Sequence, residues 1–251
     1  MLPTFTYQYL EKFMNGLTPD RLDDFLFSNP TERDTLELIL SRKLPFPYGG
    51  KSGILLHGVW GTGKTTFAEL LPNLLETAHS GTWNFAQDAG QMPADQDKDP
   101  YVHMFRCGGG LSSTAIKSTI YAANGIYPFA HYTKHDYFMF DEVDKLTSSA
   151  QQSLKSVMDL KRSMFIFTTN YLNKVDLGVI NRCHLVEMNQ AANSSAYIPL
   201  AQNILLNMGV GAGVVSNTTL DGFAVKAKGS LRNFTNDVML EGLKAGGVMP
   251  I

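Results

Sequence analysis

Apolar residues along the chain fall into two patterns, brief runs and longer amphipathic stretches. The brief runs are rich in branched or aromatic side chains and favour strands. They cover residues 53–58, 101–107, 136–141 and 164–169. The amphipathic stretches have helical spacing and cover residues 65–77, 112–124 and 148–160. Short strands that alternate with helices predict an α/β fold with a parallel sheet.

The two ends of the chain show helical patterns without strands between them. Near the N-terminus, residues 7–17 and 31–42 are amphipathic, and the second stretch follows Asn29-Pro30. After Glu187 the strand-like runs stop, and helical patterns cover residues 195–208, 218–228 and 230–245. We therefore expect an α/β domain over residues 1–189 and a small helical domain over residues 190–251. The segment 79–100 lacks periodicity and is rich in Gly, Asp, Gln and Pro, which predicts an exposed loop.

Composition narrows the class of protein only modestly. The 251 residues are 44% hydrophobic and 18% charged, which is typical of a soluble globular protein. A formal net charge of −2 argues against a wholly basic nucleic-acid binder but leaves room for a basic face. Cys107 and Cys183 are too few for a disulfide framework or a structural zinc site, and we expect both to be buried. With no secretory signal or long apolar run, we expect a cytoplasmic protein without a membrane span.

The clearest chemical signal is GVWGTGKT, from Gly58 to Thr65, directly behind the first strand-like run. It fits the phosphate-binding pattern G-x-x-x-x-G-K-[ST], in which glycines let backbone N–H groups approach phosphate oxygens. Lys64 would face the β- and γ-phosphates, and the Thr65 hydroxyl would contact Mg²⁺. A helix that begins near Thr66 would direct its positive end at the anion. The residues expected to hold ATP are Gly58, Gly61, Thr62, Gly63, Lys64, Thr65 and Thr66.

Two further strand-like runs end in residues suited to hydrolysis. Tyr137 to Phe140 lead into Asp141 and Glu142, which we expect to hold Mg²⁺ and to polarise the attacking water, respectively. We interpret the adjacent Asp144 and Lys145 as solvated loop charges. Asn170 follows the last strand-like run and would reach the γ-phosphate or the water, although an Asn there can also be a simple turn former.

Three stretches make the chain resemble an AAA+ ATPase, and within that group the small subunits of sliding-clamp loaders of the replication factor C type. They are DEVDKLTSSAQQSLKSVMD at 141–159, TTNYLNKVDLGVINRC at 168–183 and GSLRNFTND at 229–237. They resemble the family's D-E-A-D and following helix, its sensor-1 Asn with the S-R-C motif, and its sensor-2 G-D-L-R. The resemblance also includes LDDFLFSNPTERDTLELIL ahead of the phosphate loop.

The resemblance implies roles for two arginines. Arg182 matches the arginine finger that enters a neighbouring subunit's nucleotide site, which implies a homo- or hetero-oligomer. Arg232 matches the sensor-2 arginine, which contacts phosphate from a lid helix. From the residues alone, either arginine can instead be an ordinary surface cation. Asp24, Phe25 and Leu26 fall where the family wraps adenine.

Departures from the family pattern are also visible. Val59-Trp60 stands where the family has Pro-Pro, and Asn181 and Ser230 replace the Ser of S-R-C and the Asp of G-D-L-R. The second strand-like run ends in Arg106-Cys107-Gly108 instead of the family's N-A-S-D, whose polar residue can restrain the catalytic Glu. The sequence therefore does not indicate which residue restrains Glu142. Because the chain ends at Ile251, we expect no collar domain, and we expect assembly through the ATPase and lid domains or through a partner.

These observations leave three functional hypotheses. The first is a clamp-loader-like ATPase motor that acts on DNA in replication or recombination, with a sliding clamp as a candidate partner and a viral or mobile element as a candidate source. The second is a superfamily 3-like viral replicative helicase, and the third is a protein-remodelling AAA+ ATPase. A pentamer favours the loader, and a hexamer favours the other two. The candidate DNA contacts are Lys117, Lys155, Lys161 and Arg162.

Overall fold

A computed structural model describes most of the chain, in several stretches. The described residues are 22, 25, 27, 30–80, 100–108, 110–129, 131–189 and 197–248. The helix expected over residues 7–17 lies outside them, as do most of the loop expected at 79–100 and the adenine candidates Asp24 and Leu26.

The chain divides into two compact units, which are taken in turn below. The first, called the sheet unit, comprises Arg21–Gly58 and Lys64–Met188. The second, called the helical unit, includes Val59–Gly63 and Asn189–Ile251. Five residues of the phosphate-loop motif are thus grouped with the C-terminal helices.

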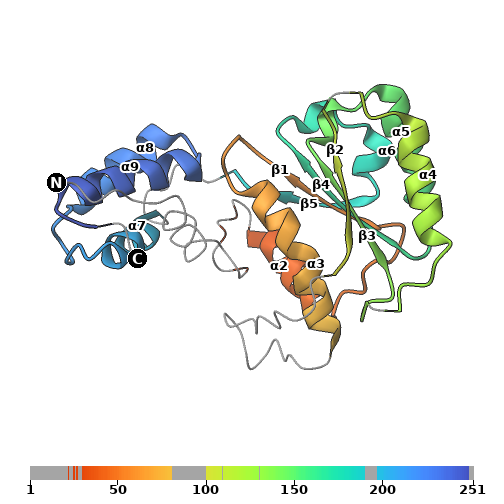
Figure 1. Ribbon diagram of the computed structural model, residues 1–251, viewed down its shortest axis with the longest axis horizontal. Coiled ribbons are helices and arrows are strands. Elements are labelled where there is room, and N and C mark those ends of the chain that lie inside the picture. The colour runs from red at the N-terminus through yellow and green to blue at the C-terminus, as the bar shows by residue number, and fades with distance from the viewer. Residues whose placement is uncertain are drawn as a thin grey trace. The chain divides into compact units, whose positions relative to one another are not determined.

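The sheet unit is built on a parallel sheet of five strands in the order β2-β3-β4-β1-β5 (Figure 1). The strands are β1 (Gly53–His57), β2 (Val102–Arg106), β3 (Asp136–Asp141), β4 (Ser163–Thr169) and β5 (Cys183–Glu187). The predicted parallel α/β sheet is confirmed. The sequence interpretation missed β5, which is an edge strand beside β1 with only two of its five positions buried. Such a strand lacks the continuous apolar run that identifies central parallel strands.

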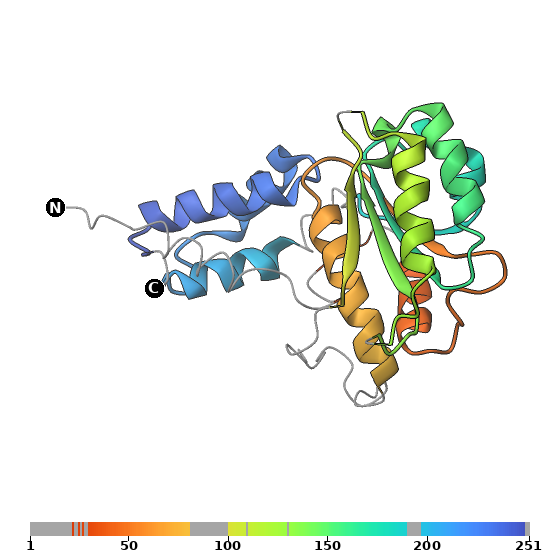
Figure 2. The ribbon, with the colours of Figure 1, turned by 45° about the vertical axis from the view of Figure 1, so that its right-hand side comes forward.

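Helices cover both faces of this sheet (Figure 2). One face packs on α2 (Pro30–Leu40) and α3 (Lys64–Ser80), and the other packs on α4 (Ser113–Asn124), α5 (Ser148–Val157) and α6 (Leu177–Ile180). Because side chains alternate along a strand, Ile54 and Leu56 join the first core while Leu55 joins the second. Burial on both faces explains why the central strands are apolar throughout, and why their polar residues gather at their ends.

Two single-turn 3₁₀ helices follow the strands that carry candidate site residues. The first, η2 (Val143–Lys145), comes after β3, and the second, η3 (Leu172–Lys174), comes after β4. In η2, Val143 is completely buried and anchors the turn in the core of the α4–α5 face. The chain therefore turns sharply at the carboxyl ends of β3 and β4, where Glu142 and Asn170 lie.

The helical unit contains the predicted C-terminal helices. They are α7 (Tyr197–Asn207), α8 (Asn217–Ala227) and α9 (Leu231–Lys244). Ser216 and Ser230 cap α8 and α9, since each hydroxyl accepts a hydrogen bond from the backbone N–H three residues on. The buried rings of Tyr197 and Phe234 pack edge to face at 4.6 Å and join α7 to α9. No helix in the described part of the chain is both long and apolar enough to span a bilayer.

Candidate functional site

The turn from β1 into α3 has the backbone that the glycine pattern predicts. Gly58, Gly61 and Gly63 all have positive φ, at 149°, 76° and 90°. A residue with a Cβ rarely adopts φ near 76° or 90°, so Gly61 and Gly63 are required by the shape of the turn. Helix α3 begins at Lys64, slightly before the position expected from the sequence.

Lys64 is buried at the first turn of α3, and its Nζ donates to the Gly58 carbonyl at 3.0 Å. Burial lowers the pKa of Lys64 to about 8, and the nearby carboxylates of Asp141, Asp144 and Glu142 oppose that shift. Because burial disfavours the charged form, an anion placed beside this ammonium would stabilise it. The group is therefore suited to an incoming phosphate.

Within the helical unit, residues 59–63 are joined to the segment before α7 and to the start of α9. The Val59 N–H donates to Asn189 Oδ1 at 2.6 Å, and the Arg232 N–H donates to the Gly61 carbonyl at 3.1 Å. A Cβ at Gly61 would clash with Ser230 Oγ, so close packing excludes a side chain there. Thr62 is buried and its hydroxyl donates to the Val59 carbonyl, while Trp60 is 60% exposed.

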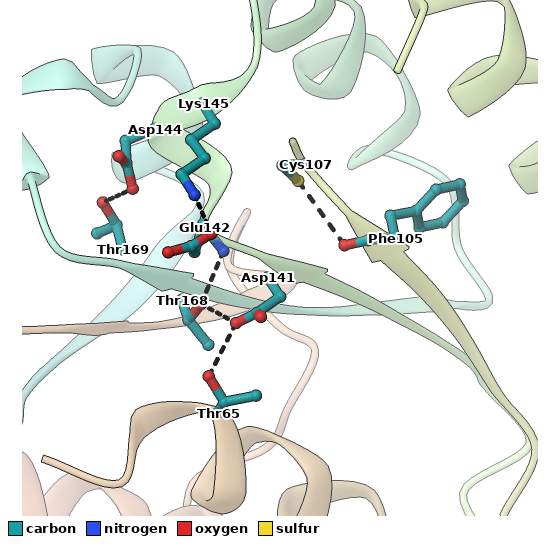
Figure 3. A network of polar contacts seen from close by, with 9 residues as sticks. All are labelled: Thr65, Phe105, Cys107, Asp141, Glu142, Asp144, Lys145, Thr168 and Thr169. Carbon is teal, nitrogen blue, oxygen red and sulfur yellow. Dashed lines mark hydrogen bonds and ion pairs between the residues drawn. The ribbon is translucent and has the colours of Figure 1, made fainter. Parts of the chain in front are cut away.

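Asp141 lies at the end of β3, and Thr65 lies in the first turn of α3. Although 76 positions separate them in the sequence, Thr65 Oγ1 donates to Asp141 Oδ1 at 3.0 Å (Figure 3). They meet because β3 and β1 flank β4 in a parallel sheet, so that all three carboxyl ends open at one edge. The structure thus brings together the hydroxyl and the carboxylate that we predicted as metal ligands.

Glu142 follows Asp141 in a left-handed backbone conformation, with φ 58° and ψ 53°. This conformation is uncommon for residues other than glycine. It separates the two carboxylates, so that the Glu142 side chain forms an ion pair with Lys145 while Asp141 faces Thr65. The predicted pair is therefore present, with its members in different environments.

Asp144 and Lys145, which we interpreted as solvated loop charges, both have side-chain partners, although Lys145 is exposed as expected. Asp144 Oδ1 accepts a hydrogen bond from Thr169 Oγ1 at 2.6 Å, and Lys145 Nζ pairs with the Glu142 carboxylate. The pKa of Lys145 is raised, chiefly by its hydrogen bond to Glu142. The 3₁₀ turn of η2 brings Lys145 back over Glu142, and this compact turn was not evident from the sequence.

Asn170 lies directly after β4, at the same edge of the sheet as the start of α3 and Asp141. Its side chain is half-buried and makes no hydrogen bond to another residue within the described stretches. A turn-forming Asn would hydrogen-bond to the nearby backbone, whereas it is Thr169 that accepts from the Tyr171 N–H here, at 3.0 Å. A contact between Asn170 and the γ-phosphate or the water stays a prediction.

Arg182 stands just before β5 and is held by Asp159. Its Nε donates to Asp159 Oδ1 at 2.9 Å and its terminal nitrogen donates to Oδ2 at 3.1 Å, which is a bidentate pair. This contact lowers the pKa of Asp159 and raises that of Arg182. The side chains are 31% and 62% exposed, so the pair lies at the surface of the sheet unit.

The donor set at Asp141 fits Mg²⁺. A hydroxyl and a carboxylate oxygen lie within hydrogen-bond distance of each other, and hard oxygen donors are what Mg²⁺ prefers. No group of three or more His, Cys, Asp or Glu side chains in the described residues could hold a metal ion on its own.

The structure also places the two cysteines and two of the candidate DNA contacts. Cys107 and Cys183 are buried as expected, and burial raises the pKa of Cys107 to about 12, so its thiol is a poor nucleophile. Among the candidate DNA contacts, Lys155 is paired with Asp176 at 3.2 Å and Arg162 donates to the Asn124 carbonyl. These two cations have structural partners within the sheet unit.

The chain is similar in sequence to subunits of DNA polymerase III and of replication factor C. In sequence, the chain is 23% identical to the DNA polymerase III subunit gamma/tau of Mycoplasma pneumoniae over 220 residues, which cover 86% of this chain and 30% of that protein. It is 27% identical to replication factor C small subunit 1 of Pyrobaculum arsenaticum over 151 residues, or 59% of this chain and 40% of that protein. The chain thus spans less than half the length of these curated relatives.

In structure, the chain is similar to the RuvB Holliday junction branch migration motor of Thermotoga maritima. The TM-score is 0.60 at 14% identity, over 91% of this chain and 72% of that chain, which is a likeness of fold. The family model for the ATPase family associated with various cellular activities (AAA) matches residues 54–190, which is more than half of the chain. That range contains the phosphate loop, the Asp141–Glu142 pair, Asn170 and Arg182. The chain therefore belongs to the AAA family of ATPases.

Proposed function

We propose that this chain is the ATP-hydrolysing subunit of an oligomeric motor that acts on DNA, of the clamp-loader type. The observation that carries the proposal is the convergence of Lys64, Thr65 and Asp141 at the carboxyl edge of the sheet. An ammonium, a hydroxyl and a carboxylate are the groups that hold a triphosphate with its cation in P-loop ATPases.

In this proposal, Thr65 and Asp141 hold Mg²⁺, which neutralises charge on the phosphates when it is bound. Lys64 binds the β- and γ-phosphates, and ATP replaces the Gly58 carbonyl as the partner of its ammonium. The N-terminus of α3 adds its positive end to the same anion. These residues bind the nucleotide and orient it before any bond breaks.

Glu142 and Asn170 are assigned to the attacking water. The Glu142 carboxylate first leaves its ion pair with Lys145 and binds the attacking water instead. It then accepts a proton from that water. This exchange is favoured because the Lys145 and Glu142 side chains are 50% and 37% exposed, so that water screens the attraction between them. Asn170, whose amide is not engaged in the described residues, orients the water or the γ-phosphate.

Arg182 is proposed to complete the site of a neighbouring subunit, which makes the active form an oligomer. To act there, the guanidinium must exchange Asp159, and the Gly178 carbonyl to which it also donates at 3.1 Å, for the neighbour's γ-phosphate. Opening an exposed ion pair costs about 1 kcal/mol or less, whereas an arginine finger contributes about a thousandfold or more in rate. The contact with Asp159 therefore holds the guanidinium at the surface without blocking the proposed role.

DNA is proposed as the substrate because the relatives found by sequence are a DNA polymerase III subunit and replication factor C subunits. The fold also matches a Holliday junction motor. With Lys155 and Arg162 engaged in internal contacts, Lys117 and Lys161 are the better candidates for phosphate contacts among the four suggested by the sequence. In the helical unit, Arg232 is proposed as the sensor-2 arginine.

The test is the steady-state ATPase rate, measured with and without primed or single-stranded DNA at low salt, together with the mass of the complex bound to a non-hydrolysable ATP analogue. We expect hydrolysis that DNA stimulates, in a pentamer. A hexamer with strand-displacement activity would instead support the helicase hypothesis, and turnover that is insensitive to DNA would remove the DNA assignment.

A further inference from the structure

Thr168 is a buried residue of β4 that none of the sequence motifs singled out. It is 2% exposed and is paired in the sheet with Leu56 of β1, two positions before Gly58. On its other side, Thr168 Oγ1 donates to Asp141 Oδ1 at 2.6 Å (Figure 3). The same hydroxyl accepts a hydrogen bond from the Glu142 backbone N–H at 2.9 Å. Both hydrogen bonds of this hydroxyl are therefore made to the acidic pair.

The first bond determines where the Asp141 carboxylate points. Oδ1 accepts from Thr168 on the sheet side and from Thr65 on the α3 side, so two hydroxyls from different elements converge on one oxygen. Thr65 is exposed, whereas Thr168 is buried beneath the site. The Thr168 bond is thus the one that water competes with least, and it remains available when the Thr65 hydroxyl turns to a ligand.

The second bond supports the unusual backbone of Glu142. A left-handed conformation at a non-glycine residue persists only where its surroundings over-determine it. Here the Glu142 N–H is held by Thr168 from below, and the following Val143 side chain is locked in the core. Together they direct the Glu142 side chain away from Asp141, so that the two carboxylates serve different partners.

We propose that Thr168 is a positioning residue that sets both carboxylates of the hydrolytic site through one hydroxyl. This inference rests on the proposed function, because it assigns Thr168 to the Mg²⁺-dependent step of that site. Groups that orient metal-binding carboxylates typically change metal affinity or activity by about 10- to 100-fold when they are removed. Thr168 touches neither nucleotide nor water in this assignment, so its effect is exerted through Asp141 and Glu142.

The neighbouring Thr169 offers a matched control. It is also completely buried in β4, and its hydroxyl also donates to a carboxylate, that of Asp144, at 2.6 Å. Because side chains alternate along a strand, Thr169 points to the opposite face from Thr168. Its loss removes the same kind of bond from the same strand, together with the acceptor of the Tyr171 N–H, without touching Asp141 or the Glu142 N–H.

The experiment compares Thr168→Val, Thr168→Ser and Thr169→Val in the full chain. Binding of a non-hydrolysable ATP analogue is measured by calorimetry in EDTA and in saturating Mg²⁺, and kcat, KM and Tm are measured alongside. For Thr168→Val we expect the affinity in EDTA to stay within about threefold of the wild type. We expect its Mg²⁺-dependent gain in affinity, and its kcat, to fall about 10-fold or more. Thr168→Ser keeps the hydroxyl and should restore both values to within about threefold.

A purely structural role would lower Tm equally in both valine variants while the Mg²⁺-dependent gain and kcat stayed equal to the wild type, and that result would overturn the inference. If Thr168→Val does not fold, Thr168→Ala replaces it, with the same expected and contradicting results. Failure of the proposed function looks different. In that case the wild type itself would not bind the analogue, or Glu142→Gln would turn over ATP at the wild-type rate, and both proposals would fall together.

Discussion

Two polar networks lie at opposite ends of β3, and each is centred on a carboxylate of the sheet unit. At the carboxyl end, Asp141 is half-buried and accepts from Thr65 and Thr168. At the amino end, Glu76 of α3 is 5% exposed. Its carboxylate accepts from the Tyr132 N–H, from the N–H and hydroxyl of Thr133, and from the Tyr137 hydroxyl.

The two carboxylates differ in how many hydrogen bonds their oxygens already accept and in how far they are closed to solvent. Glu76 is surrounded by donors on both oxygens and closed to solvent, so its bonds join α3 to the segment before β3 and serve stability. Asp141 is only half-buried and receives both of its side-chain hydrogen bonds on one oxygen, Oδ1. Lys64 and Glu76 are only about 18 Å apart along α3. In the proposed function, one helix thus carries a reactive end at Lys64 and an anchoring end at Glu76.

The largest expected effects come from the reactive end. Lys64→Ala removes the ammonium that faces the phosphates, and we expect ATP affinity to fall at least about 100-fold. Glu142→Gln should leave ATP affinity within a few-fold and lower kcat at least about 100-fold, because the amide cannot accept the water's proton. Calorimetry and a steady-state ATPase assay measure the two effects. Lys43→Ala, at an exposed lysine of the same unit, serves as the control. Equal losses of affinity in both lysine variants would contradict the assignment.

Arg182→Ala tests whether the reactive end is complete within one subunit. We expect hydrolysis to fall about a thousandfold while ATP affinity stays within a few-fold, because the finger acts on a neighbour's nucleotide. Mixing Arg182→Ala with Glu142→Gln subunits should restore part of the activity, since some interfaces regain a complete set of groups.

The matched variant for this test is Arg33→Ala, which removes another ion-paired surface arginine of the same unit. It should leave turnover close to that of the wild type. Normal hydrolysis by Arg182→Ala would show that the site needs no neighbour.

A substitution at the anchoring end should lower the stability of the protein and leave its ATP binding unchanged. Glu76→Ala leaves several buried donors without an acceptor, and we expect the free energy of unfolding to fall by about 3 kcal/mol. ATP affinity per folded molecule should stay near the wild-type value. Urea unfolding measures the first quantity, and Glu69→Ala, at an exposed glutamate of the same helix, should change it by less than about 0.5 kcal/mol. A loss of ATP binding without a loss of stability would remove the contrast between the two networks.

The smallest expected effect is a change of ATP affinity with pH, which comes from the titration of Lys64. With its pKa near 8 in the free protein, Lys64 is charged below that pH in both free and ATP-bound states, so affinity there does not depend on its titration. Phosphate stabilises the ammonium and raises its pKa in the complex. Above pH 8, binding must therefore take up a proton, and affinity falls by up to about tenfold per pH unit. Calorimetry in buffers of different ionisation enthalpy detects this uptake, which should be absent from Lys64→Arg.

Much of the reactive end could be predicted because its signals are local. The spacing of Gly58, Gly61, Gly63 and Lys64 reflects a single turn, and apolar strands that end in Asp141 or Asn170 place polar groups at one edge of any parallel sheet. The family resemblance added Arg182, whose bond to Asp159 was not predicted. The anchoring end had no such signal, since Glu76 looks like an ordinary polar residue of an amphipathic helix.

By itself, the sequence determined the first four strands and the helices between them, the phosphate loop and the identity of the acidic pair, because each depends on residues a few positions apart. Only the tertiary structure decided what those residues contact. Thr168 and Asp141 are 27 positions apart and meet through the register of β3 with β4. Glu76 and Tyr137 are 61 apart and meet because α3 packs across that sheet. Such contacts follow from strand order and helix packing, which periodicity along the chain does not encode.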